Sequence, residues 1–479
     1  MKKITNNFFC TILYNFVTFI TPLILLPYLT RTIGSNNIGA YNFCDSITQY
    51  VIFLGCIGTG LYAQREIAKN QEDNQCLNSI FWSIFVIRVL FLTIAAAIYF
   101  LIAINADKYH AQIYVILSIT IASAAIDISW FFQGIELFRI VALRNIIIKI
   151  ICIIFVLATV NDENDFLYYV FIMASSNICG NVLLWLEISK YIQKPEISFK
   201  NIKKYILHSL VLFFPQIAIN LYAQLDKVMI GFITQIDAEV AYYSLAEKII
   251  KFPLIIPMSI GSILLSRIAY LVSQRKWNLV NKYIYRSMRI INMLMIPVCF
   301  GIVGIGDIFV IWFFGEGYER VFANIIFLFP IVVIIGMSNV IGIQYLLAKN
   351  YQAAFTKSVL AGALINFIIN LFLIPIYKSV GASISTVIAE MAVTIIQLYF
   401  VMSDLKLSKL FDGFNVYLIS GLIMYLSICL MNKLNINFNL IIIIGAIAYF
   451  SLNLIQRDLI IRICIRFIKK TIKIKYEKI

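Results

Sequence analysis

Long apolar runs recur along the whole chain, and they limit its fold more than any other feature. A helix needs about 20 mostly apolar residues to cross the hydrocarbon core of a bilayer. The runs predict fourteen spans, at 8–33, 39–64, 78–104, 111–134, 142–160, 166–189, 205–233, 240–266, 284–314, 321–348, 355–377, 380–403, 413–432 and 437–456. We therefore expect an all-α polytopic membrane protein with about 14 transmembrane helices.

The composition excludes other classes of protein. The 479 residues are 61% hydrophobic and 13% charged, whereas soluble domains carry about 25% charged residues. No polar stretch is long enough for a catalytic domain, so no enzymatic activity is expected. The net charge of +15 could suit nucleic acid, but the cations fall in short loops without an aromatic-rich basic module. We therefore predict a lipid bilayer as the partner and no nucleic acid.

Cysteine and histidine usage gives no sign of a metal or cofactor. The nine cysteines form no CxxC pair, and most lie in apolar runs. The only histidines, His110 and His208, are far apart in the chain. No GxxxxGK[ST] motif for nucleotide phosphates occurs, so an ion gradient, the membrane potential or removal of the substrate must drive any transport.

The distribution of Lys and Arg predicts the orientation. With a cytoplasmic N-terminus, 29 of the 39 Lys and Arg residues lie on the cytoplasmic side and 5 on the outer side, with the rest inside spans. Cytoplasmic loops of membrane proteins carry such an excess. Both termini are therefore predicted to be cytoplasmic. The basic tail 457–479 is predicted either as an interfacial helix or as an irregular positive segment.

The longest polar connection before the tail divides the spans into six, six and two. This division predicts an N-lobe at 1–190, a cytoplasmic linker at 191–204, a C-lobe at 205–404 and accessory spans at 405–456. A faint repeat supports it, since an Ala-Tyr-polar start follows a Leu-x-basic stretch near Arg31 and again near Lys227. Repeated halves around a central cavity are common in transporters.

Ionisable residues inside predicted spans are the first candidates for function. Each costs about 2.5–3.5 kcal/mol at the membrane centre, so each is expected to face a cavity or a partner. Glu247 and Lys251 are four residues apart and can pair on one helix face, whereas the neighbours Asp226 and Lys227 must point in different directions. A cavity-lining cation would suit an anionic substrate, and a structural ion-pair network is the alternative. The group comprises Asp45, Asp226, Lys227, Glu247, Lys248 and Lys251.

Three further charges inside spans are candidates for function. Arg88 in the third span and Asp127 in the fourth are at similar depths, so a pair across neighbouring helices is predicted. The pair could be structural, or it could act as a conformational latch or ion-coupling site. Glu390 lies in the middle of the twelfth span and is a candidate for proton coupling.

Prolines in the spans suggest helices that bend. Pro22 and Pro27 lie in the first span, Pro215 in the seventh, and Pro253 and Pro257 in the eighth. Proline removes a helical hydrogen bond and kinks the helix. We expect these helices to be the bending elements of a rocking transporter, with ordinary membrane-helix prolines as the alternative.

Several motifs resemble those of Wzx-type polysaccharide flippases. They are LPYLTRTIG, IGAYNF, SITQY and YAQREIA within 26–68, SWFFQGIELF at 129–138, RNIIIKI at 144–150, YAQLDKVMIGF at 222–232 and VAYYSLAEKI at 240–249. A looser match is the NFIINLFLIPIY run at 366–377. The motifs are spread over the first eight predicted spans, and the rest of the chain resembles the family in its length and number of spans.

The resemblance implies the multidrug/oligosaccharidyl-lipid/polysaccharide exporter superfamily, with two six-helix lobes around a central cavity plus two C-terminal helices. It implies an undecaprenyl-diphosphate-linked oligosaccharide as substrate, moved from the inner to the outer leaflet of the bacterial cytoplasmic membrane for O-antigen, capsule or exopolysaccharide assembly. A polysaccharide polymerase is a further expected partner. Lys227 and Lys248 fall in the matching motifs and would hold the diphosphate, with Arg31 and Arg88 as secondary candidates.

Two related functions remain as alternatives. A drug or solute antiporter of the same superfamily would have a cavity with fewer cations, and a lipid II flippase would be mechanistically close. A membrane-embedded polymerase or glycosyltransferase needs a large loop or a catalytic domain, and the loops here are too short for either.

Overall fold

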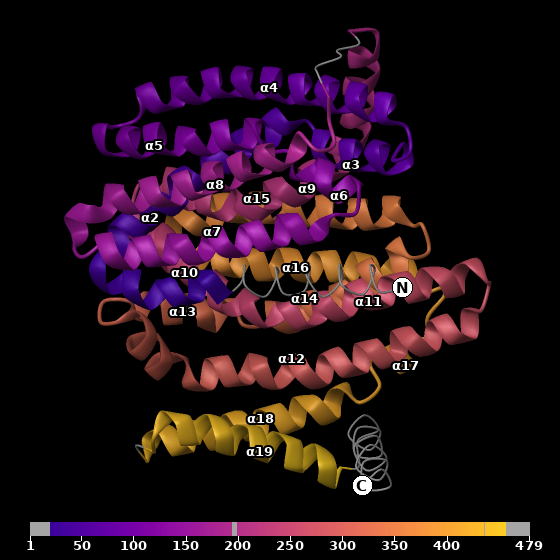
Figure 1. The fold of residues 1–479 in the computed structure, drawn as a ribbon. Helices are drawn as coiled ribbons and strands as arrows, with labels where there is room; N and C mark the ends of the chain where they lie inside the picture. Colours follow the sequence, from indigo (N-terminus) through magenta and orange to yellow (C-terminus); the bar gives the residue numbers. More distant parts are fainter. Residues whose placement is uncertain (1–19, 194–198, 435, 457–479) are drawn as a thin grey trace, which may run out of the picture. The chain divides into compact units, whose positions relative to one another are not determined.

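The computed structural model describes residues 20–193, 199–434 and 436–456, and all regular secondary structure in these ranges is helical (Figure 1). The chain divides into two compact units, Met1–Ser244 and Leu245–Ile479, with the boundary inside helix α10. The predicted lobes at 1–190 and 205–404, with the linker at 191–204 between them, are not tested by this division and stay a prediction.

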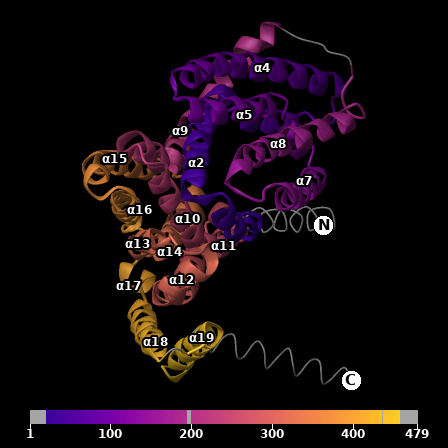
Figure 2. The same cartoon turned by 90° about the vertical axis from the view of Figure 1, so that its left-hand side faces the viewer.

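In the first unit, helical residues 20–32 lead into a series of helices. These are α2 (Gly34–Cys56), α3 (Thr59–Lys69), α4 (Asn74–Asn105), α5 (Lys108–Ala125), α6 (Ser129–Gly134), α7 (Phe138–Thr159), η1 (Glu163–Asp165), α8 (Phe166–Ile188), α9 (Phe199–Thr234) and the start of α10 (Asp237–Lys251). Figure 2 shows α4, α5 and α8 side by side, in agreement with the packing of α5 against both of the others.

The second unit continues from the end of α10. Its elements are η2 (Phe252–Leu254), α11 (Ile255–Ser273), α12 (Trp277–Phe314), α13 (Glu319–Leu328), α14 (Ile331–Ser338), the π-helix η3 (Asn339–Leu347), α15 (Gln352–Tyr377), α16 (Ser379–Val401), α17 (Leu407–Leu410), α18 (Phe414–Lys433) and α19 (Phe438–Ile455). Helices α18 and α19 pack on each other and on α12 (Figure 1).

Every predicted span after the first coincides with one of these helices or with a broken series of them. Among the described residues, ten helices are long and apolar enough to cross a membrane, or up to twelve if each bent pair is one span. An all-helical polytopic membrane protein is thus confirmed. The number fourteen stays a prediction, because the first span begins outside the described residues and α9 is not among the ten to twelve. The tail 457–479 lies outside the described residues, as does 194–198 of the predicted linker.

Two breaks bend described spans by more than 40°. The first, of 43°, separates α2 from α3 at Ile57 and Gly58, both of which have positive φ. Gly58 is required there, because a Cβ would lie 2.8 Å from the Ser209 carbonyl oxygen. The second break, of 42°, follows α13 at Pro330. These breaks lie in the second and tenth predicted spans, and the eighth is interrupted by the 3₁₀ turn Phe252–Leu254 at Pro253. Proline accompanies the second break, whereas backbone conformation and packing account for the first. Bending of the first and seventh spans stays a prediction.

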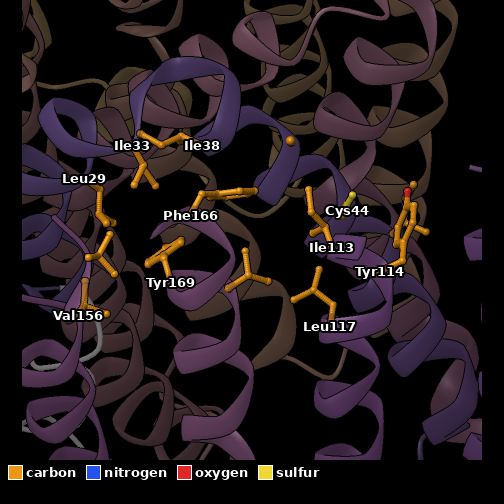
Figure 3. Packing of buried hydrophobic residues seen from close by; sticks show 14 of the residues in the cluster. Leu29, Ile33, Ile38, Cys44, Ile113, Tyr114, Leu117, Val156, Phe166 and Tyr169 are labelled. Carbon is orange, nitrogen blue, oxygen red and sulfur yellow. The ribbon is translucent and has the colours of Figure 1, made fainter. Parts of the chain in front are cut away.

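The core of the first unit is a dry cluster of aliphatic and aromatic side chains. Leu29, Ile113, Leu117 and Phe166 are among its buried members, which Figure 3 shows converging from separate helices. A buried hydroxyl within this packing is satisfied, because the Tyr99 hydroxyl donates to the Tyr114 carbonyl at 3.0 Å and lies 2.9 Å from the Thr48 hydroxyl. Burial of a hydroxyl without a partner would cost about 1–3 kcal/mol.

The outer surfaces of both units carry rows of exposed aliphatic side chains. On α4, Ile94, Ile98 and Leu101 are more than half exposed, and on α18 Leu426 and Leu430 are each 63% exposed. In water such continuous apolar surface would be an aggregation liability. A lipid environment removes that penalty, so these faces are the ones that contact acyl chains.

The partly buried Lys349 links the end of the π-helix segment to neighbouring side chains in the second unit. The Lys349 ammonium lies 2.7 Å from Asp404 Oδ2 and 4.8–5.3 Å from the ring centroids of Trp277, Tyr345 and Tyr351. Burial alone would lower the pKa of Lys349, but its contacts with Asp404 and Tyr345 raise that pKa overall. Lys349 therefore stays charged at every pH below the ordinary lysine pKa of about 10.4.

The Lys349→Met protein should be less stable by about 1–2 kcal/mol, because it loses a partly desolvated ion pair and cation–π contacts. The measurement is the unfolding midpoint in mild detergent, with exposed Lys357→Met as the matched control. Because the pKa of Lys349 is raised in the folded protein, the stability it contributes is lost only as pH rises above the ordinary lysine pKa. The difference in unfolding midpoint between Lys349→Met and the unmodified protein should therefore be the same at about pH 6 and about pH 9. A deficit that shrinks across that interval would contradict this account.

Candidate functional site

Polar side chains of α2, α9 and α10 meet inside the first unit and form what we call the polar seam: Asn42, Ser46, Gln224, Lys227 and Ser244. Asn42 Nδ2 donates to Ser244 Oγ at 3.0 Å, and Ser46 Oγ donates to Gln224 Oε1 at 3.2 Å. Asn42 and Ser244 are buried, so these bonds form away from solvent. The seam thus provides hydrogen-bonding groups within an otherwise apolar bundle.

Lys227 adds a cation to this seam. Its ammonium donates to Gln224 Oε1 at 3.4 Å, and the side chain is only partly buried. Its neighbour Asp226 is 6% exposed and accepts a 2.5 Å hydrogen bond from the Tyr243 hydroxyl. The prediction that these two adjacent charges take different directions is confirmed, and each has its own partner.

Close backbone packing holds α2 against the α9–α10 connection. A Cβ on Gly39 would lie 1.7 Å from the Asp237 carbonyl oxygen, and one on Gly231 would lie 2.2 Å from the Phe43 ring. The first turn of α5 also contacts this connection, because His110 Nε2 lies 3.1 Å from Asp237 Oδ1. His110 Nδ1 lies 2.6 Å from Asp107 Oδ1. Only glycine permits this approach, which brings the seam residues within hydrogen-bonding distance.

The other predicted candidates lie in several places. In α10, Lys251 pairs with Glu247 at 2.6 Å, which confirms the predicted pair, and Lys248 is partly buried. Asp45 in α2 accepts a hydrogen bond of 3.1 Å from Gln49. Two further candidates are Arg31, exposed at the end of the first described helix, and Glu390, partly buried in α16 of the second unit.

The predicted pair between Arg88 and Asp127 is confirmed. Arg88 Nη2 lies 3.3 Å from Asp127 Oδ2, and Arg88 Nε donates to the Ala124 carbonyl at 2.8 Å. Asp127 Oδ1 also accepts from the backbone N–H of Ser129, the first residue of α6, at 2.9 Å. The pair therefore holds α4 to the break between α5 and α6.

Beside this pair lies a cavity of about 260 Å³, which we call the glutamine pocket. Its lining residues come from α2, α3, α4, α6, α9 and the bend between α5 and α6. The sequence motifs contained Gln64, Trp130 and Gln133 but did not mark them as site residues. Amides inside apolar spans were the signal that could have revealed them. The lining is Phe53, Cys56, Gly58, Gly60, Leu61, Gln64, Arg88, Asp127, Ser129, Trp130, Gln133 and Gln216.

The second unit has its own buried amides around the π-helix η3. Ser287 Oγ donates to Gln344 Oε1 at 2.7 Å, and Gln344 Nε2 donates to Asn339 Oδ1 at 3.3 Å. A nine-residue π-helix is unusual, and such segments often occur at functional sites. Within residues 20–193, 199–434 and 436–456, no group of three or more His, Cys, Asp or Glu residues is placed to hold a metal ion.

Comparison with known proteins places this arrangement in a family. A family model described as polysaccharide biosynthesis protein matches residues 4–272, more than half of the chain. The chain is similar to the "Putative O-antigen transporter" of Escherichia coli strain K12, with 26% identity over 399 residues that cover 81% of this chain and 94% of that protein. A protein of the same name from Shigella dysenteriae is 22% identical over 402 residues, which cover 83% and 99% of the two chains.

Solved structures show the same fold at low identity. The lipid II flippase MurJ in an inward closed conformation aligns with a TM-score of 0.73 and 16% identity, over 94% of this chain and 100% of that one. An inward-facing multidrug resistance MATE family transporter of the MOP superfamily aligns with a TM-score of 0.60 and 14% identity, over 82% and 94%. The resemblance to Wzx-type flippases is thus confirmed at the level of the family. The chain is a multi-pass membrane protein that belongs to the polysaccharide biosynthesis protein family, and it has the fold shared by MurJ and the MATE transporters.

Proposed function

We propose that this protein is a flippase for undecaprenyl-diphosphate-linked oligosaccharide repeat units. It would move them from the inner to the outer leaflet of the bacterial cytoplasmic membrane by alternating access, for O-antigen, capsule or exopolysaccharide assembly. Two six-helix lobes, two accessory spans and cytoplasmic termini complete the proposal. The bias of 29 to 5 in loop Lys and Arg residues supports that orientation. A polysaccharide polymerase would take up the delivered repeat unit.

The observation that carries the proposal is Lys227, a cation inside a membrane bundle beside the amide and hydroxyl groups of the polar seam. A diphosphate and its attached sugar cannot cross hydrocarbon alone, because charge and hydroxyls lose their hydrogen bonds to water there. A lysine donates to phosphate oxygens through a charge-assisted bond. The seam hydroxyls and amides would replace water around the head group, while the polyprenyl chain stays in lipid.

Substitution of Lys227 or Lys248 by Ala tests this function. Each protein should reach the membrane at the normal level but lower surface polysaccharide by about 10- to 100-fold, as expected for the loss of one charge-assisted contact of about 1.5–3 kcal/mol. Lys69→Ala is the matched control, because Lys69 is exposed and pairs only with Glu66 in its own helix. Normal polymer output from both variants would rule out the proposed role of these cations.

The related functions require a transport assay with purified protein in liposomes. A polysaccharide flippase should expose an undecaprenyl-diphosphate-linked oligosaccharide to a membrane-impermeant oxidant faster than lipid II. Faster exposure of lipid II would assign the protein to peptidoglycan synthesis instead. Movement of a cationic dye with neither lipid moving would assign it to solute export.

A further inference from the structure

The glutamine pocket lies beside the bend between α2 and α3 and beside residues 126–128, where α5 ends and α6 has not yet begun. Its polar groups come from separate helices: Gln64 on α3, Gln133 on α6 and Gln216 on α9. Trp130 is buried yet contributes part of the wall. Three helices, α3, α6 and α9, therefore each supply one amide to a single small cavity within one compact unit.

Local contacts hold this pocket in shape. The Trp130 indole N–H donates to the Asp127 carbonyl at 2.9 Å, which fixes the plane of the ring. Gly134 permits close packing of α6 on α3, because a Cβ there would lie 2.7 Å from Ile67 and 3.1 Å from the Gln64 carbonyl oxygen. A ligand would therefore enter a pocket that needs little rearrangement, and this favours binding.

The charges in the pocket cancel each other. Arg88 is the only cation in the lining, and its guanidinium already contacts Asp127 and the Ala124 carbonyl. A phosphate entering here would have to compete with the Asp127 carboxylate for Arg88 and would be repelled by it. The pocket is thus unsuited to the diphosphate, a role for which Arg88 was a secondary candidate, and suited to a neutral polar group.

The lining matches the chemistry of a sugar ring. Each glutamine amide both donates and accepts, as each hydroxyl does, so the amides can pair with hydroxyls in either direction. Gln216 already donates one N–H to the Leu212 carbonyl at 2.9 Å, which leaves its second N–H and its oxygen. Trp130, Phe53 and Leu61 supply apolar surface for the C–H face of the ring. A volume of about 260 Å³ is below the range of about 300–1,000 Å³ for drug-sized ligands, so it suits one ring rather than a whole repeat unit.

We infer that the glutamine pocket binds one neutral sugar of the lipid-linked glycan and thereby contributes to substrate selection. This inference rests on the proposed function, because the sugar arrives attached to the diphosphate carrier. Lys227 and the seam would recognise what all such substrates share. The pocket would recognise the sugar, by which they differ.

Binding of two defined lipids to the purified full-length chain in nanodiscs tests the inference. The probes are undecaprenyl diphosphate and the same lipid bearing glucose, galactose or N-acetylglucosamine, with affinity measured by microscale thermophoresis. At least one glycosylated lipid should bind about ten-fold more tightly than the bare carrier, which corresponds to one or two hydrogen bonds. The Gln64→Leu/Gln133→Leu protein should lose that ratio, and Gln274→Leu, at an exposed position outside the pocket, should keep it.

Two further variants separate the possible failures. The unfolding midpoint of the Gln64→Leu/Gln133→Leu protein would reveal whether that variant fails to fold. Gln133→Met keeps the size of the side chain and should by itself reduce the ratio of affinities for glycosylated and bare lipid. Lys227→Ala should weaken both lipids alike. Equal binding of bare and glycosylated lipid by the unmodified protein, or a ratio kept by Gln133→Met, overturns the sugar pocket but not the flippase. No binding of any of these lipids overturns the proposed function and this inference with it.

Discussion

The Gly39→Ala protein should lose transport almost completely, by about 100-fold. A Cβ at this position would lie 1.7 Å from the Asp237 carbonyl oxygen and 2.3 Å from its carbon, and both atoms are backbone. If the nearest atoms belonged to a side chain, that side chain could rotate away from the new methyl group. Because they are backbone atoms, the whole α9–α10 connection would have to move. Overpacking usually costs about 1–3 kcal/mol, and here we expect at least the upper value.

The same substitution tests the conformational role of this contact. In the proposed lobes, Gly39 belongs to the second span and Asp237 to the loop before the eighth, so α2 must separate from that loop when the lobes rock. The Ala variant would favour the separated arrangement, and surface polysaccharide would report the loss. Gly301→Ala is the matched control, because its Cβ would meet only Met424 Cε at 3.8 Å. A helical Gly→Ala change in such open space is neutral or stabilising. Equal transport by the two variants would contradict the packing argument.

The second large effect is expected at the pair between Arg88 and Asp127. Arg88→Met should lower the free energy of unfolding by about 2–3 kcal/mol, because it leaves Asp127 desolvated without its cation. Breaking a fully buried ion pair costs about 3–5 kcal/mol. The expected loss is smaller here because the Asp127 side chain is 23% exposed. Asp127→Asn removes the charge and keeps an oxygen that can still accept the hydrogen bond from the Ser129 N–H.

A double-mutant cycle isolates the interaction between the two residues. The double variant should be less destabilised than the sum of the single variants by about 1–2 kcal/mol, as for residues in direct contact. The measurement is denaturant unfolding of the four proteins in mild detergent. Strict additivity would show that Arg88 acts through the Ala124 carbonyl alone.

Hydrophobic length and charge placement were sufficient to predict much of the protein. Membrane helices make all their backbone hydrogen bonds internally, so an apolar run of adequate length predicts a helix with little tertiary information. Local spacing also predicted the pair between Glu247 and Lys251, because residues four apart share a helix face. Arg88 and Asp127 were predicted as partners since unpaired charges are costly inside a membrane.

Other features depended on contacts between distant parts of the chain. The break at Ile57 and Gly58 carries no proline signal, and its need for glycine arises from Ser209, far away in the sequence. The glutamine pocket is likewise assembled from residues on separate helices, each of which alone is only an amide in an apolar run. The π-helix of Asn339–Leu347 is stabilised by Ser287 in another helix, which the local pattern does not reveal.

The sequence by itself thus determined the class of protein, the positions of most spans and the family, because these depend on hydrophobic length, charge and local motifs. Tertiary structure decided which polar groups meet. It directs Lys227 to the polar seam and Asp226 to Tyr243, although the two residues are neighbours in the chain. Tertiary structure also pairs Arg88 with Asp127 and places three glutamine side chains in the same cavity lining. The physical reason is that the cost of burying a polar group depends on its partners, and helix packing alone brings those partners together.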